Sequence, residues 1–147
     1  MNEESQPKLE RRACVRFRIP GATVSYHRLA ALPLLKNKLE EAFCPLFDLS
    51  RGGARFLTRQ PVPLETHLEL ELQIPGETVP LKMKGKVRWV APYEGKNYPF
   101  QVGVQFFPYG EEKGQNYPGN LVKIIALEQK FIEKTTLDDK DKDEFIV

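Results

Sequence analysis

Apolar and polar residues alternate strictly through the middle of the chain. The alternation runs through three segments, residues 66–74, 79–90 and 100–107. In the first segment, leucines and Ile74 fall on one side and glutamates on the other. A period of two with one apolar face is typical of antiparallel strands that are buried on one side only. The pattern therefore predicts three half-buried antiparallel strands.

Shorter apolar segments extend this pattern toward the N-terminus. They are residues 15–19, 22–27, 44–49 and 53–57. Turn signals separate the segments, including Pro-Gly pairs and a Gly-Gly pair. Several short strands with such spacing are typical of a small barrel or sandwich. Trp89 falls on the apolar face of its predicted strand, so we expect it to pack in the core.

Two segments depart from the alternation and favour helices. Residues 34–43 follow Pro33, a residue type that suits the start of a helix. Residues 119–134 have the stronger helical pattern, because their apolar side chains lie near one stripe. The stripe consists of Leu121, Ile124, Ile125, Phe131 and Ile132. It has to be covered, most simply by an open end or side of the barrel.

The composition fits one domain with polar ends. Of the 147 residues, 41% are hydrophobic, and the formal net charge of +2 is too balanced for holding nucleic acid by charge alone. We expect a flexible N-terminal arm over residues 1–11, a barrel with its helix over 12–134, and a disordered acidic tail over 135–147. Neither a membrane-spanning run nor a signal peptide is recognisable, which predicts a cytoplasmic protein.

The sequence lacks the motifs of common active sites. Cys14 and Cys44 show neither metal-binding spacing nor a disulfide framework, so we expect reduced thiols. His27 and His67 are far apart on separate predicted strands. No glycine-rich phosphate loop, HExxH or GxSxG is present. We therefore expect no metal site and no catalytic residues, and a protein that is not an enzyme.

The stretch DLSRGG, residues 48–53, carries more polar chemistry than a turn requires. The Asp48 carboxylate can accept two hydrogen bonds at once from the Watson–Crick edge of guanine, and Ser50 can donate to a phosphate or a base. Gly52 and Gly53 would let the backbone take positive φ and let a ligand approach closely. These features suit a nucleotide-binding turn.

A cluster of arginines precedes the first predicted strand. Arg12 and Arg16 offer planar guanidinium groups that suit phosphate oxygens, the O6/N7 edge of guanine and stacking on a purine. With DLSRGG they describe a pocket for an anionic guanine nucleotide. A plainer interpretation stays open, in which Asp48 and Ser50 cap a turn, the glycines form a bulge and the arginines are solvated.

The two motifs together resemble those of the PilZ domain family, the bacterial receptor module for cyclic di-GMP. The signature of that family is RxxxR, followed some tens of residues later by (D/N)xSxxG. The matching residues here are Arg12, Arg16, Asp48, Ser50 and Gly53. The order of strands and the terminal helix also resemble the family over roughly residues 8–132. The long segment 28–43 departs from the family's pattern.

The resemblance implies an all-β fold, a six-stranded antiparallel barrel with a C-terminal helix, to which we add a short inserted helix. It implies cyclic di-GMP as the ligand, no metal, and a non-enzymatic effector or adaptor in which the N-terminal arm rearranges over the ligand. The site residues expected on this basis are Arg11, Arg12, Arg16, Asp48, Ser50, Arg51, Gly52 and Gly53. An unidentified protein partner would recognise the rearranged arm.

Other functions and stoichiometries stay open at this point. A nucleotide-independent interaction adaptor could keep the barrel, although the intact motif counts against it. A small RNA- or DNA-binding barrel would explain the basic arm, but the strand faces lack aromatic stacking positions, so we expect no nucleic acid polymer as partner. In the PilZ family, an arginine immediately before the motif tends to accompany an intercalated pair of ligands. Arg11 resembles that arrangement, which suggests two nucleotides per chain and a homodimer.

Overall fold

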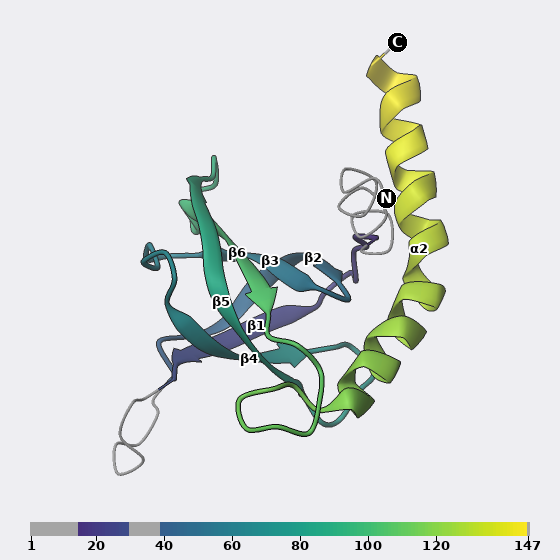
Figure 1. The fold of residues 1–147 in the computed structure, drawn as a ribbon. Helices are drawn as coiled ribbons and strands as arrows, with labels where there is room; N and C mark the ends of the chain where they lie inside the picture. The colour runs from purple at the N-terminus through teal and green to yellow at the C-terminus, as the bar shows by residue number, and fades with distance from the viewer. Residues whose placement is uncertain (1–14, 30–38, 147) are drawn as a thin grey trace, which may run out of the picture.

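The computed structural model describes residues 15–29 and 39–146, with side chains described through Ile132. Its elements are β1 (Thr23–Arg28), β2 (Glu41–Ser50), β3 (Gly53–Thr58), β4 (His67–Gln73), β5 (Leu81–Pro92), β6 (Phe100–Phe106) and α2 (Pro118–Ile146). The six strands close into an antiparallel barrel in the order β1-β2-β3-β6-β5-β4 (Figure 1). The prediction of a six-stranded antiparallel barrel with a C-terminal helix is confirmed.

The core of the barrel is built from the apolar positions of the alternating strands. Leu68, Leu70 and Leu72 of β4 are fully buried, as are Met83 and Val87 of β5. Burying a side chain of this size contributes about 1.5–3 kcal/mol. The polar positions face outward, where glutamates of β4 stand opposite lysines of β5, and such pairs of opposite charge favour this register.

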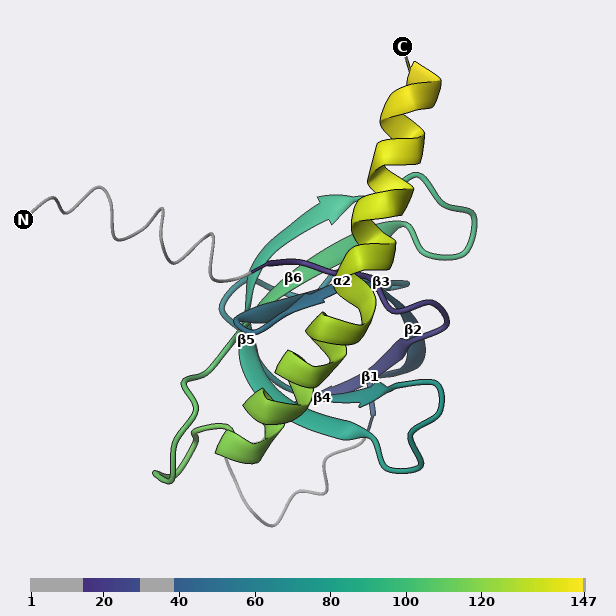
Figure 2. The same ribbon diagram turned by 90° about the vertical axis from the view of Figure 1, so that its right-hand side faces the viewer.

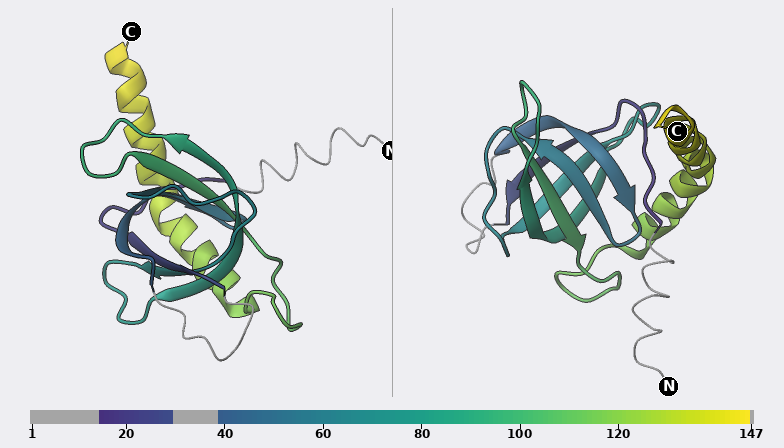
Figure 3. Two further views of the ribbon diagram at one scale, coloured as in Figure 1. Left: turned by 90° about the vertical axis from the view of Figure 1, so that its left-hand side faces the viewer. Right: turned by 90° about the horizontal axis from the view of Figure 1, so that it is seen from above.

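Helix α2 lies outside the barrel, with its first half against the strands and its second half extending beyond them (Figures 2 and 3). Ile124 is fully buried, and Leu127 and Phe131 pack against the core. Asn120 Nδ2 donates to the backbone oxygen of Lys82 on β5, at 2.9 Å. The helix continues to Ile146, whereas no regular structure was expected from residue 135 on. Among the described residues, no helix is long and apolar enough to cross a membrane.

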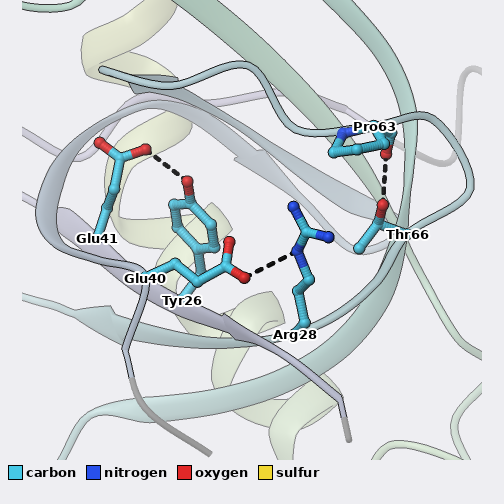
Figure 4. Close-up of polar contacts among 6 residues, drawn as sticks. All are labelled: Tyr26, Arg28, Glu40, Glu41, Pro63 and Thr66. Atoms are coloured by element: carbon cyan, nitrogen blue, oxygen red, sulfur yellow. Dashed lines mark hydrogen bonds and ion pairs between the residues drawn. The ribbon is translucent and has the colours of Figure 1, made fainter.

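The predicted helix over residues 34–43 is wrong at its C-terminal end. Strand β2 already begins at Glu41, while residues 34–38 lie outside the described part of the chain. The Glu41 carboxylate accepts from the Tyr26 hydroxyl of β1 (Figure 4). It also accepts from the Arg59 backbone N–H. These contacts with neighbouring segments outweigh the local helical pattern. Phe43 sits at a positive φ of 56°, in the irregular part of the β1–β2 pairing.

Residues 15–19 form a single antiparallel bridge, and the prediction of a strand there is wrong. The bridge joins Phe17 to Leu49 near the end of β2. Phe17 is fully buried and belongs to the core of the barrel. The alternation in this segment therefore reflects two buried anchors, Phe17 and Ile19, with arginines beside them.

Candidate ligand-binding site

A cavity of about 650 Å³ lies where the β2–β3 turn meets strands β5 and β6. Five of the residues expected from the sequence line it, Arg16, Asp48, Ser50, Gly52 and Gly53. The fold thus brings the second arginine of the first motif to the second motif. Arg11 and Arg12 lie outside the described residues. Arg51 does not line this cavity.

Arg16 reaches the cavity because Phe17 anchors its segment. The backbone N–H of Phe17 donates to the oxygen of Leu49, and that of Leu49 donates to the oxygen of Phe17, both at 2.9 Å. In an extended segment, neighbouring side chains point to opposite sides. Burial of Phe17 therefore turns Arg16 and Arg18 outward, and the Arg18 guanidinium lies 4.8 Å from the ring centre of Phe47.

Asp48 is buried, with 6% of its surface exposed, and is ion-paired with Arg55. The two residues are cross-strand partners of β2 and β3. The Arg55 guanidinium also lies over the Phe47 ring, 4.2 Å from its centre. In the described part of the chain, Asp48 thus bonds an arginine side chain rather than capping the turn, and a carboxylate with one oxygen engaged retains acceptor capacity.

Ser50 does shape the turn, as the plainer interpretation proposed. Its hydroxyl accepts from the Gly52 backbone N–H at 3.2 Å, and it donates to the Gly53 oxygen at 3.4 Å. A serine hydroxyl bonded two residues ahead is typical of a side-chain-stabilised turn. The site contact expected for Ser50 and this structural role are compatible, because the residue also borders the cavity.

The expectation of positive φ at Gly52 and Gly53 is wrong, because neither residue adopts it. Gly53 instead lies so close to β6 that a Cβ there would be 2.4 Å from the backbone oxygen of Val104. Such a distance is far below van der Waals contact. The motif glycine therefore allows strands β3 and β6 to pair closely beside the cavity.

Trp89 lines the cavity, which contradicts its predicted place in the core. The β5–β6 register shifts between Val87 and Trp89, so that Trp89 pairs with Gly103 and Val90 turns toward the core. One extra residue at such a bulge reverses the faces of the strand beyond it. The indole covers Gly103, where a Cβ would lie 2.2 Å from its Nε1 atom.

The charge around the cavity is mainly positive. Arg16, Arg55 and Arg88 line it with a single acid, Asp48. Arg88 also lies 3.7 Å from Glu65 in an exposed ion pair. Within the described residues, no three His, Cys, Asp or Glu side chains are grouped closely enough to hold a metal ion. Excess cationic charge beside an aromatic wall suits a ligand that is both anionic and flat.

Among the lining residues that were not predicted from the sequence are Arg55, Arg88 and Trp89. Arg55 was visible as the first charged residue after the motif glycines. Gly103 was a signal for Trp89, because a glycine in the middle of an otherwise apolar strand often marks a bulge or a close approach. Neither the motifs nor the alternating pattern indicated that Arg88 would line the cavity.

A family model for the PilZ domain matches residues 10–117 of the chain. The chain therefore belongs to the PilZ domain family. Domains of this family are in general non-enzymatic modules that bind cyclic di-GMP. A comparison with curated proteins found no match to the chain.

Proposed function

We propose that this protein binds cyclic di-GMP in the cavity between the β2–β3 turn and strands β5 and β6, and acts as a non-enzymatic effector. The observation that carries the proposal is that Arg16, Asp48, Ser50 and Gly53 border one cavity on a PilZ barrel. The two motifs are separated by some tens of residues in the sequence. If each only stabilised its own local segment, nothing would require both to line the same cavity.

The base of the ligand would lie between Asp48 and Trp89. The carboxylate oxygen that Arg55 leaves free would accept from the N–H donors of guanine. The indole of Trp89 offers a flat apolar face on which a purine stacks. Adenine presents no pair of adjacent donors to such a carboxylate, so this arrangement favours guanine.

The phosphates would lie toward the arginines. Arg16 is exposed at the rim and can form charge-assisted hydrogen bonds with a phosphate oxygen. Arg12, outside the described residues, would supply the second guanidinium. We further propose that the N-terminal arm, residues 1–11, rearranges when nucleotide binds. Phe17 anchors the described segment that carries Arg16 through its backbone bonds to Leu49.

Isothermal calorimetry with four ligands tests the proposal. Cyclic di-GMP should bind with saturable heat, while cyclic di-AMP, GMP and single-stranded RNA should bind at least about tenfold more weakly. Equal binding of cyclic di-AMP would refute the role of Asp48. Preferred binding of RNA would identify a nucleic-acid barrel instead, and no binding of any ligand would favour a nucleotide-independent adaptor.

A further inference from the structure

Arg51, in the middle of the DLSRGG motif, contacts helix α2 instead of the ligand cavity. Its Nη2 and Nε atoms donate to the same oxygen of Glu128, at 2.7 and 3.2 Å. Glu128 is 8% exposed, and with Asp48 it is one of the two buried acids among the described residues. Both buried acids therefore pair with arginines in or beside the ligand-binding motif.

The same turn makes a second contact, with the loop that precedes α2. The Tyr109 hydroxyl donates to the backbone oxygen of Arg51 at 2.6 Å. Tyr109 belongs to the loop before α2, which Asn116 fixes by hydrogen bonds to both backbone groups of Lys84. The turn is thus joined to the loop through its backbone and to the helix through its side chain.

Glu128 lies one helical turn beyond the buried anchor of α2. Ile124, four residues earlier on the same face, is fully buried in the core. A buried carboxylate that loses its cation is strongly destabilised unless water reaches it. If Arg51 left Glu128, this part of α2 would have to move away from the barrel to hydrate the carboxylate.

The β2–β3 turn separates the ligand cavity from the helix. Gly52 borders the ligand cavity and also a second cavity of about 310 Å³, which Arg51 and Tyr109 line. Arg51 is two-fifths exposed, so its long side chain can reorient on the surface of the turn. A ligand with two phosphates would offer Arg51 a second anionic partner.

We propose that the Arg51–Glu128 ion pair is a latch that couples nucleotide binding to the docking of helix α2. The inference rests on the proposed binding of cyclic di-GMP. In the latched state Arg51 holds Glu128 and the helix is docked. A ligand phosphate competes for Arg51, and the uncompensated Glu128 carboxylate then drives the middle of α2 off the barrel. Such competition makes nucleotide binding and helix docking mutually unfavourable, and the coupling is reciprocal.

Hydrogen exchange of α2, measured with and without saturating cyclic di-GMP, tests the latch. Amide exchange over residues 121–132 should accelerate by about fivefold or more on binding. Glu128→Gln, which keeps the size of the side chain, should speed this exchange without nucleotide and tighten nucleotide binding by about fivefold or more. Glu40→Gln removes the carboxylate of the exposed Arg28–Glu40 pair and is the control, which should change neither quantity.

The double variant Arg51→Glu/Glu128→Arg separates docking from ligand sensing. It restores an ion pair, so the helix should exchange slowly. The carboxylate that replaces the Arg51 guanidinium cannot take a phosphate, so nucleotide should no longer accelerate the exchange. If the wild type binds cyclic di-GMP with unchanged or slower exchange in α2, or if Glu128→Gln binds no more tightly, the latch is wrong while the proposed function stands. Failure of the wild type to bind would overturn both.

Discussion

The carboxylate of Asp48 on β2 is ion-paired with the guanidinium of Arg55, its cross-strand partner on β3. Arg55 is itself stacked over Phe47, which restricts its orientation. The acid that would recognise guanine is thus held from one side and can offer only its remaining acceptor sites to a ligand. Arg55 is, on this geometry, a positioning residue for Asp48.

The first prediction concerns Arg55→Met, which keeps the apolar bulk over Phe47 and removes the charge. Asp48 would stay buried without a cation, so the free energy of unfolding should fall by about 2 kcal/mol, below the full cost of breaking a buried pair because Arg55 is partly exposed. Affinity for cyclic di-GMP should fall by roughly tenfold, because the carboxylate is no longer oriented. Urea unfolding and calorimetry measure the two effects.

The double variant Asp48→Asn/Arg55→Met provides the control. Removing both charges should recover most of the lost stability but none of the binding, because guanine recognition needs the carboxylate. If the stability losses of the two single variants simply add, the residues are not coupled and Arg55 does not position Asp48.

A second prediction contrasts two of the glycines that line the cavity, Gly53 and Gly103. A Cβ on Gly53 would meet the backbone of β6, which cannot move without breaking the strand pairing. Gly53→Ala should therefore lower the free energy of unfolding by about 1–3 kcal/mol. Thermal and urea unfolding measure this loss, and an unchanged stability would show that the motif glycine serves only the approach of a ligand.

Gly103→Ala should act on binding rather than on stability. The three atoms nearest to the added Cβ all belong to the indole of Trp89, a side chain that can swing aside. Because Trp89 is the chain's single tryptophan, a shift in its emission reports that displacement directly. Affinity for cyclic di-GMP should fall by roughly threefold to tenfold with the loss of the stacking wall. Unchanged emission together with unchanged affinity would place Trp89 outside the ligand's contacts.

The fold could be predicted from the sequence because the barrel strands are half-buried. The period-two alternation of their residues indicates both that the element is a strand and which face is buried. In β4, for example, the alternating residues Leu68, Leu70 and Leu72 are buried. The prediction of a helix over residues 34–43 is wrong from Glu41 on, because contacts with Tyr26 and Arg59 of other segments decide the conformation there. Local patterns carry no information about such long-range partners.

The candidate site could be predicted as far as its motifs extend. Arg16, Asp48, Ser50 and Gly53 were found because their residue types match both guanine chemistry and the PilZ signature. Trp89 was missed because a single bulge inverts the strand face, which no alternation reveals. The orientation of the Arg51 side chain depends on its ion pair with Glu128, which lies 77 residues away in the sequence.

A third prediction concerns the Cys44 thiol, which is buried against Glu41. Burial, with a smaller effect from the charge of Glu41, raises the pKa of this thiol from 9.0 to about 12. Native protein carrying Cys14→Ser should therefore react with a thiol reagent at neutral pH far more slowly than unfolded protein, by at least about a hundredfold.

The same shift predicts how stability depends on pH. Folding favours the neutral thiol, so its contribution is complete below pH 9.0 and is lost progressively as pH rises toward the folded pKa of about 12. Cys44→Ala should weaken this alkaline loss of stability. Rapid labelling of the native thiol at pH 7 would contradict the buried environment that the structure gives Cys44.

Calorimetric titration of the wild type, Arg16→Ala and Arg28→Ala tests whether cyclic di-GMP binds in the cavity. Arg16 lies at the cavity, and Arg28 is an exposed arginine elsewhere, paired with Glu40. Neither change should alter stability by more than about 0.5 kcal/mol. Arg16→Ala should weaken binding by tenfold to a hundredfold, corresponding to the loss of about 1.5–3 kcal/mol of charge-assisted hydrogen bonding, while Arg28→Ala binds like the wild type. Equal affinity of Arg16→Ala and wild type would contradict the assignment of the site.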